Sequence, residues 1–260
     1  MTYSTLQLEQ QDPIATITLT RPEKRNAIST QMIEELVAAL DEVEKGSSQV
    51  LIITGTGKAF CAGMDLDGLS AIASQSLEKN IQDSRKMAQM FCRIYDFPKP
   101  VISAVNGAAI AGGCGIATLA DFAIAVPEAK FGYSEVRIGF IPALVSVFLR
   151  RQIGEKNATD LLLTGRVVDA AEALRMGLIT EVVAAEKLME RARELAGVML
   201  AASPTSIART KRLLRSFERA AIAAEIETAT RENAEIRTTA DFREGVASFL
   251  EKRPPKWTGR

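Results

Sequence analysis

The sequence predicts an α/β core followed by a smaller, mainly helical C-terminal part. Up to Pro142, short apolar segments alternate with glycine-containing loops and with segments of helical periodicity. After Pro142, one short strand is expected and the remaining patterns are helical. The chain has 260 residues, of which 47% are hydrophobic and 25% charged, so it can bury one main core with a smaller appendage.

The predicted strands lie mostly in the first half of the chain. Alternating apolar and polar residues around Asp12-Pro13 predict a hairpin, and Ser29 or Thr30 is expected to cap a helix that runs to about Lys45. Strands are predicted at 4–10, 13–19, 50–54, 101–105, 122–126 and 130–133, a further helix at 76–95, loops at 21–27 and 55–68, and a glycine-rich turn into a helix start at 106–115.

The second half of the chain is predicted to be helical apart from a strand near 178–183. The expected helices are 144–152, 155–163, 169–176, 185–200, 204–219, 221–238 and 240–251.

The charge balance and the cysteine content indicate the cellular compartment of the protein and the kinds of partner that it can bind. Lysine plus arginine equals aspartate plus glutamate at 32 each, so no broad basic field exists to attract nucleic acid or an anionic membrane. Cys61, Cys92 and Cys114 have no metal-like spacing, which favours reduced, buried thiols. The N-terminal segment lacks a signal or transit pattern, and no apolar run has the length of a membrane span. We therefore expect a cytoplasmic protein without membrane or nucleic-acid partners.

The absence of histidine restricts the chemistry that the chain can perform. With no histidine in the sequence, Ser-His-Asp triads, histidine bases and histidine-ligated metals are excluded. Proton transfer must therefore use carboxylates, Tyr, Cys or Lys. No motif implies a metal or a redox cofactor.

Two glycine-rich segments precede expected helices and expose backbone amides. GTGKAFCAG at 55–63 lacks the spacing and the Lys-Ser/Thr ending of a P-loop, and NGAAIAGGCG at 106–115 lacks the spacing of a dinucleotide-binding turn. Small residues beside a helix start leave amide groups free to donate to a developing negative charge. Both segments therefore favour an oxyanion hole over a nucleotide site.

Several motifs together resemble the enoyl-CoA hydratase/isomerase (crotonase) family. They are RPEKRNAI at 21–28, KAFCAGMDL at 58–66, KPVISAVNGAAIAGGCGIATLADFAIA at 99–125, AKFGYSEVRIGFIP at 129–142, LLLTGRVVDAAEALRMGLITEVV at 161–183 and FLEKRPPKW at 249–257. The resemblance implies a superhelix of repeated ββα units in residues 1–200, with the CoA and active sites. It also implies a helical oligomerisation region in residues 201–260, which builds a homo-oligomer, a trimer or a dimer of trimers.

The resemblance also implies which residues act on an acyl-CoA thioester. The backbone amides of Met64 and Gly112 match the two donors that hold the enolate oxygen, and Glu135 matches a general acid/base. A standard hydratase has a second glutamate directly after GGC, where this chain has Gly115. Because glycine cannot transfer a proton, a mechanism with two glutamates is excluded.

One carboxylate suffices for double-bond isomerisation, in which Glu135 removes a proton alpha to the thioester and returns it at the gamma carbon. Burial in an apolar pocket is expected to raise the pKa of Glu135 toward neutrality. Hydration stays open if Asp67, Tyr133 or a water held by the backbone replaces the missing group. Cys114 lies beside the oxyanion segment, but it has no evident basic partner, so a buried thiol is expected there.

Further positions are assigned to CoA and to the acyl group. By resemblance, Lys24 matches a position near the CoA phosphates and Ala62 a backbone contact to adenine, whereas Phe249 and Lys252 would approach CoA from a neighbouring subunit. The acyl pocket is expected to be lined by Met64, Leu66, Leu69, Gly115, Phe140, Ile141 and Leu144. No cofactor is implied beyond the CoA that forms part of the substrate.

Three functional hypotheses follow. The first is an acyl-CoA isomerase or hydratase that uses Glu135. The second is another enolate reaction, such as decarboxylation or thioester hydrolysis, in which Gly115 leaves room for a different substrate group. The third is a CoA-binding protein without turnover.

Overall fold

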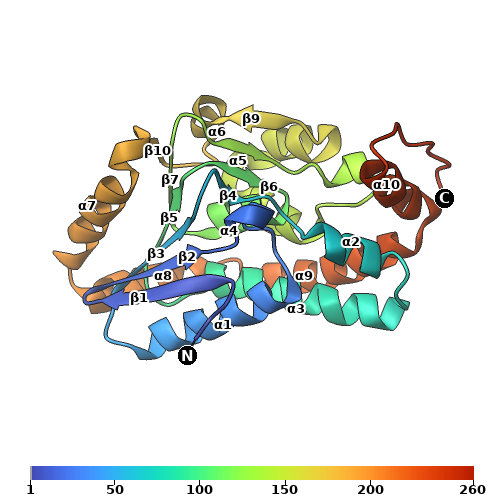
Figure 1. The fold of residues 1–260 in the computed structure, drawn as a ribbon. Helices are drawn as coiled ribbons and strands as arrows, with labels where there is room; N and C mark the ends of the chain where they lie inside the picture. The colour runs from blue at the N-terminus through green and yellow to red at the C-terminus, as the bar shows by residue number, and fades with distance from the viewer. Residues whose placement is uncertain (1) are drawn as a thin grey trace.

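The computed structural model describes residues 2–260, apart from the side chains of Leu66, Asp67 and Ser70, and contains two β-sheets surrounded by helices (Figure 1). The strands are β1 (Leu6–Gln11), β2 (Ile14–Leu19), β3 (Val50–Gly55), β4 (Ala59–Cys61), β5 (Val101–Val105), β6 (Ala108–Ile110), β7 (Phe122–Ala125), β8 (Lys130–Gly132), β9 (Val167–Asp169) and β10 (Glu181–Val182). The α-helices are α1 (Thr30–Lys45), α2 (Leu66–Ile72), α3 (Leu77–Tyr95), α4 (Gly112–Leu119), α5 (Ala143–Thr164), α6 (Ala170–Met176), α7 (Leu188–Leu200), α8 (Pro204–Ser216), α9 (Arg219–Glu235) and α10 (Ala240–Leu250). The short 3₁₀ helices are η1 (Pro22–Lys24), η2 (Glu135–Ile138), η3 (Ala185–Lys187) and η4 (Ile236–Thr238).

From β3 to β8, successive strands alternate between the two sheets. The larger sheet has the order β1-β2-β3-β5-β7-β10, and the smaller one has the order β4-β6-β8-β9. Along the chain β3 precedes β4, β5 precedes β6, and β7 precedes β8, and each pair is followed by helical structure. Apart from the antiparallel pairs β1–β2 and β8–β9, neighbouring strands are parallel. The expected α/β core of repeated ββα units is therefore confirmed.

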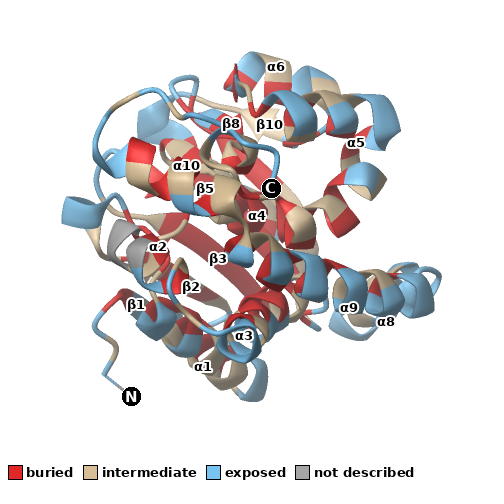
Figure 2. Cartoon of the chain, turned by 90° about the vertical axis from the view of Figure 1, so that its right-hand side faces the viewer, coloured by how far each residue is buried: buried red, intermediate tan, exposed pale blue. Residues whose placement is uncertain are grey.

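The central strands of the larger sheet are covered on both faces. The apolar residues of β3 and β5 pair in parallel, with Leu51 opposite Val101 and Ile52 opposite Ile102, and all four are fully buried. Figure 2 shows these buried strands enclosed by helices that carry exposed residues on their outer sides. A run of apolar residues without polar alternation is typical of such doubly covered parallel strands.

Local signals set the ends of several helices. The Ser29 hydroxyl accepts a hydrogen bond from the Met32 amide at 3.1 Å, so α1 begins and ends as predicted. Ser76 likewise caps α3, which ends before Pro98. The two helices predicted at 144–152 and 155–163 are both present within α5, where Gly154 separates them at a kink with non-helical angles of φ 75° and ψ 162°.

Three short strands were missed in the sequence. Residues 55–68, predicted to be loop, contain β4 and the start of α2, and β6 and β9 were not predicted. Each of these strands has three residues, too few to display an alternating pattern, and each forms because a strand distant in the sequence pairs with it. In the described part of the chain, no helix is long and apolar enough to cross a membrane.

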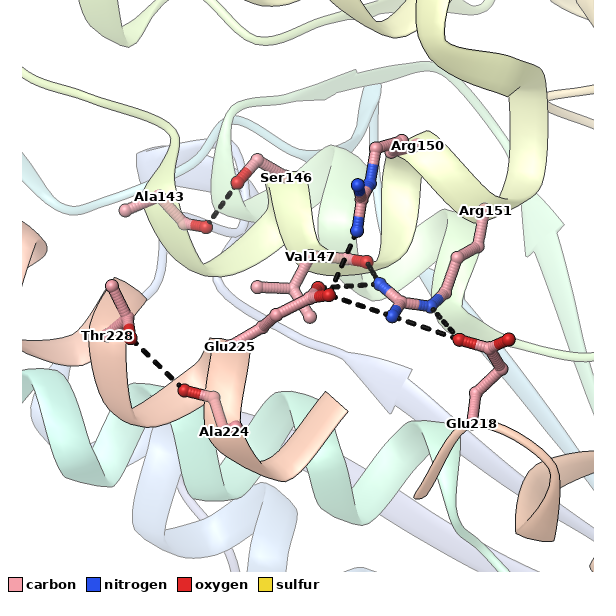
Figure 3. A network of polar contacts seen from close by, with 9 residues as sticks. All are labelled: Ala143, Ser146, Val147, Arg150, Arg151, Glu218, Ala224, Glu225 and Thr228. Carbon is pink, nitrogen blue, oxygen red and sulfur yellow. Dashed lines mark hydrogen bonds and ion pairs between the residues drawn. The ribbon is translucent and has the colours of Figure 1, made fainter. Parts of the chain in front are cut away.

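Two arginines on α5 hold α9 in place (Figure 3). Arg151 donates to Glu225 at 2.7 Å and to Glu218 at 3.1 Å, and Arg150 donates to Glu225 at 2.9 Å. These partly exposed pairs contribute about 0.2–1 kcal/mol each. Buried residues of α9, such as Ala229, add apolar contact with the main core. As a result, the N-terminal half of α9 is fixed against the core.

A second, smaller core joins α2 to α10. Leu69 and Ile72 from α2, Phe140 after η2, and Phe242 and Val246 from α10 are buried together. The Phe140 and Phe242 rings are 5.3 Å apart, a separation typical of tilted aromatic pairs. The C-terminal helix therefore packs against loops that follow the strands of the smaller sheet.

Candidate active site

Three parallel strands of the smaller sheet bring the predicted catalytic positions together. Ala59 pairs with Ala108, and Ala109 pairs with Phe131, so β4, β6 and β8 are adjacent and run in the same direction. Their carboxyl ends meet at one edge, and the segments that follow carry Met64, Gly112 and Glu135. All three residues line one cavity of about 160 Å³.

The Met64 amide is directed away from the nearest backbone. Ile28 donates to the Gly63 carbonyl at 2.7 Å, and Asp65 donates to the Ile28 carbonyl at 2.9 Å, which makes Ile28–Met64 a parallel bridge. In such a bridge the N–H of the middle residue points to the side opposite its partner. The Met64 N–H is therefore available to a ligand on that side.

Gly112 is the first residue of α4, where amide groups have no acceptor within the helix. The preceding residue, Ala111, has a φ of 52° and a ψ of −127°, a conformation that is strained for a residue with a side chain. Its own N–H donates to the Gly132 carbonyl at 2.7 Å, which holds the turn in place. The strained turn therefore starts α4 directly at the cavity.

Two glycines allow the segments that carry these amides to touch. Gly63 has a φ of 90°, and a Cβ atom there would lie 3.0 Å from the Ile110 carbonyl oxygen. A Cβ at Gly113 would lie 2.2 Å from the Cys61 carbonyl oxygen, which is too close for any side chain. Glycine at both positions is thus a condition for placing the Met64 and Gly112 amides on one cavity.

A buried ion pair fixes the Met64 segment from behind. The Arg21 guanidinium lies 2.7 Å from the Asp65 carboxylate and also donates to the Ala27 carbonyl at 2.6 Å. Both side chains are largely buried, and the contacts link the RPEKRNA segment to the residue after Met64. The position of the Met64 amide therefore depends on this pair.

Glu135 is a buried carboxyl group with an unsatisfied oxygen. It begins η2, is 8% exposed, and its Oε2 atom has no hydrogen-bond partner. Burial raises the pKa of Glu135 from 4.5 to about 7. Among the described residues that line the cavity, it is the only carboxylate. Such a group can exchange a proton with a ligand near neutral pH.

Comparison with known proteins places the chain in a family. The profile of the enoyl-CoA hydratase/isomerase family matches residues 9–260. The chain belongs to this family. A Thermus thermophilus relative is 42% identical over 245 residues, which cover 94% of this chain and 97% of that protein. The 2,3-dehydroadipyl-CoA hydratase of Escherichia coli is 32% identical over 99% of this chain and 100% of its own length.

Solved structures of the family agree with this fold. The carnitinyl-CoA hydratase of Mycobacterium avium superposes with a TM-score of 0.86 and 34% identity, and the match covers 100% of both chains. The resemblance inferred from the motifs, the crotonase-type fold and the assignment to an enzyme family are therefore confirmed.

Most of the residues predicted for the family site line the cavity. They are Ala62, Met64, Leu69, Gly112, Glu135, Phe140, Ile141, Leu144 and Phe249. The side chains of Leu66 and Asp67 lie outside the described residues.

The predicted CoA contacts are divided between the cavity and the surface. Lys24 is exposed on η1, next to Arg25, whose carbonyl accepts a hydrogen bond from the Ala62 amide at 3.0 Å. Lys252 is exposed after α10, three residues beyond Phe249. Phe249 lines the cavity of its own chain, whereas the resemblance implied a contribution from a neighbouring subunit. This difference arises because α10 packs on η2 and α2 of the same chain.

Gly115 does not open the cavity. A Cβ atom there would lie 2.7 Å from Cγ1 of Val145 and 3.1 Å from Cε1 of Phe91, so the space next to it is filled. The hypothesis that Gly115 leaves room for a different substrate group is therefore wrong. Val145 and Phe91 line the cavity instead.

The other candidate groups are buried away from the cavity. The Tyr133 hydroxyl lies 3.3 Å from the Thr118 hydroxyl, and burial raises the pKa of Tyr133 well above its usual value. Burial also raises the pKa of Cys114 to about 12, so it is a protonated thiol, as the sequence predicted. In the described part of the chain, no group of three or more Cys, Asp or Glu side chains could hold a metal ion.

Two polar residues that the C-terminal helices bring to the cavity were missed in the sequence. Asn233 near the end of α9 and Arg237 in η4 both line it, and Arg237 donates to the Asn233 side chain at 2.6 Å. Their spacing of four residues places them on one helical face. Nothing in the local sequence distinguishes them from surface residues, because only the packing of α9 on α3 and α5 brings them to the site.

The packing around Gly115 leads to a prediction about stability. We expect Gly115→Ala to lower the free energy of unfolding by about 1–3 kcal/mol, because the added methyl group overlaps Val145. In a protein that already carries Val145→Ala, the Gly115→Ala replacement should lower the free energy of unfolding by less than it does in the unmodified protein. Urea denaturation of the four proteins in this cycle measures the coupling.

Gly197→Ala is the matched control, since this helical glycine of α7 has no atom within 4 Å of an added Cβ. It should stabilise the protein by roughly 0.5–1 kcal/mol. Equal effects of alanine at positions 115 and 197 would contradict the packing argument.

The raised pKa of Glu135 predicts a pH-dependent stability. Between pH 4.5 and 7 the folded protein keeps a proton that the unfolded chain releases, so the free energy of unfolding falls as pH rises through this window. The loss amounts to about 3 kcal/mol and is complete above the folded-state pKa. Glu135→Gln cannot ionise and should escape this loss.

Urea denaturation at pH 5 and pH 8 tests this prediction. The variant should gain stability relative to the unmodified protein on going from pH 5 to pH 8, while all other titrating groups contribute equally to both proteins. A constant difference between the two would show that Glu135 has an ordinary pKa.

Proposed function

We propose that this enzyme moves the double bond of an enoyl-CoA, with Glu135 as its single acid/base group. The observation that carries the proposal is that Glu135 is the only carboxylate among the described lining residues, on the same cavity as the Met64 and Gly112 amides. Isomerisation needs one group that removes and returns the same proton, whereas the two-glutamate hydration mechanism needs two.

The reaction follows from the chemistry of these groups. The Glu135 carboxylate removes a proton from C2 of a 3-enoyl-CoA, and the electron pair shifts to the thioester oxygen to give a dienolate. The Met64 and Gly112 amides donate to that oxygen, and two such donors supply several kcal/mol. The protonated Glu135 then gives the proton to C4, which leaves a 2-enoyl-CoA and restores the carboxylate.

The electrostatics of Glu135 suit both halves of this shuttle. With a pKa of about 7, it is partly ionised at neutral pH and releases the captured proton readily. Its lack of a hydrogen-bond partner on Oε2 leaves that atom available to the substrate.

CoA binding and assembly belong to the same proposal. We assign Lys24 and Lys252 to the CoA phosphates, Ala62 to a backbone contact with the adenine and Phe249 to a CoA contact. Lys24 is exposed beside Arg25, whose carbonyl accepts a hydrogen bond from Ala62, and Lys252 is exposed three residues after Phe249. A trimer or dimer of trimers is supported by exposed apolar side chains at the end of α8: Leu213, Leu214 and Phe217. In this proposal, residues 1–200 form the core and residues 201–260 the oligomerisation region.

The cytoplasm is the compartment that we propose, since the three cysteines are free thiols. The equal numbers of acidic and basic residues support the absence of nucleic-acid and membrane partners. CoA enters as part of the substrate, and no separate cofactor is assigned.

Hydration is the second candidate function. It is favoured by the names of relatives, among them the 2,3-dehydroadipyl-CoA hydratase of Escherichia coli. In that case Glu135 alone would activate a water for attack at C3 and deliver its proton to C2.

The product of the reaction separates the two functions. Purified protein is given a 3-enoyl-CoA or a 2-enoyl-CoA, and the products are followed by mass spectrometry and chromatography. We expect a 2-enoyl-CoA of unchanged mass from the 3-enoyl substrate. A gain of one water from the 2-enoyl substrate, without isomerisation of the other, would reject the first function in favour of hydration.

The role of Glu135 is tested by Glu135→Gln. We expect turnover to fall by at least about 10²-fold, since the amide cannot take up the proton, while acyl-CoA binding persists. In the unmodified enzyme, kcat/KM should rise as pH passes through about 7, because the carboxylate form removes the proton. Gln7→Glu at an exposed site is a control without effect on turnover. A variant with normal turnover would exclude Glu135 as the base.

A further inference from the structure

Arg237 is a buried cation that faces the cavity without a negative partner. It lies in η4, is 3% exposed, and lines the same cavity as Glu135. Its Nη2 atom donates to Asn233, but its Nε and Nη1 atoms are buried and have no hydrogen-bond partner. Two nitrogens of the guanidinium therefore offer donors that the protein itself does not use.

No carboxylate of the described chain pairs with this guanidinium. Asp83 favours its charged form only from a distance, and its own carboxylate lies 2.8 Å from Lys79. Burial lowers the pKa of Arg237 to about 10, which still leaves it charged at neutral pH. A buried charge without a counter-charge is costly, and proteins keep one mainly where a ligand supplies the missing partner.

Glu135 is not that partner, although it lines the same cavity. Neither carboxylate oxygen of Glu135 bonds to Arg237, and a close guanidinium would lower the pKa of Glu135, which burial instead raises to about 7. The two groups therefore contact different parts of a bound molecule. Glu135 faces the reacting carbons, and Arg237 faces a more remote group.

The cavity limits the size of that molecule. Its volume of about 160 Å³ compares with the roughly 150 Å³ of an engineered protein cavity that holds benzene. Leu69, Phe140 and Ile141 make the surroundings apolar, and the Arg237 guanidinium lies 5.6 Å from the centre of the Phe140 ring. The acyl group must therefore be short, apolar along its length and negatively charged where it meets Arg237.

We propose that Arg237 binds a carboxylate at the far end of the acyl chain, so that the substrate is the CoA monothioester of a short, unsaturated dicarboxylic acid. The guanidinium is the side chain best suited to a carboxylate, because its planar N–H groups match the carboxylate oxygens. The inference rests on the proposed function, to which it adds the substrate class.

Binding of saturated acyl-CoA thioesters tests this inference without requiring turnover. Isothermal titration compares glutaryl-CoA and adipyl-CoA, which end in a carboxylate, with pentanoyl-CoA and hexanoyl-CoA of the same carbon numbers. We expect the unmodified protein to bind at least one carboxylate-ended ligand about tenfold or more tightly than its neutral counterpart, since charge-assisted hydrogen bonds discriminate by this much. Arg237→Met should bring this ratio close to one.

Two further variants make the result specific. Arg237→Lys keeps the charge but not the planar group, so it should retain part of the preference. Arg166→Met removes an arginine that already pairs with Asp160 and Glu172 outside the cavity, and it should keep the full ratio.

Equal affinity for charged and neutral ligands in the unmodified protein, or a preference that survives in Arg237→Met, would overturn the inference. Turnover of neutral enoyl-CoA by the same preparation tests the proposed function separately. An enzyme that converts neutral substrates without preferring carboxylate-ended ligands keeps the proposed function and loses this inference.

Discussion

The parallel pairing of β4, β6 and β8 is the constraint on which the site depends. Because the three strands run side by side in one direction, the segments after them reach the same edge of the sheet. Those segments supply two backbone amides and one carboxyl group, from Met64, Gly112 and Glu135. Because Gly63 and Gly113 have no side chains, these segments can then come into direct contact. The backbone topology, more than any single side chain, assembles the proposed oxyanion donors.

Burial gives Glu135 its chemical character and also costs stability. No neighbouring charge raises its pKa; the removal of water from the carboxyl group is sufficient. The same desolvation acts on Arg237, whose charge persists because a guanidinium has so high an ordinary pKa. The cavity thus holds one group near its titration point and one that stays charged. The first is suited to proton transfer and the second to fixed recognition of an anion.

The sequence predicted those features that depend on local signals. The Ser29 cap and the apolar face of α1 lie within one helix, so its ends were predicted correctly. Motif resemblance supplied Met64, Gly112 and Glu135, whose proximity no periodicity could reveal. By contrast, β4 and β6 escaped prediction because three-residue strands exist only through their pairing. The filled space at Gly115 depends on Val145 from α5, and Arg237 reaches the cavity only through the packing of α9.

The contacts that attach α9 to the core also determine the position of Arg237, the residue that we propose selects the acyl group. The ion pairs of Arg150 and Arg151 with Glu225 tie α9 to α5, and the hydrogen bond from Ser84 to Asn233 at 2.7 Å ties its far end to α3. Asn233 in turn accepts from Arg237, so the guanidinium is held by a helix that contributes no residue to the oxyanion donors. In the proposed mechanism, changes in α9 or η4 alter the preferred acyl group while the strands that position Glu135 remain as they are. The proposed recognition of the acyl chain and the proposed stabilisation of the enolate thus rest on separate parts of the fold.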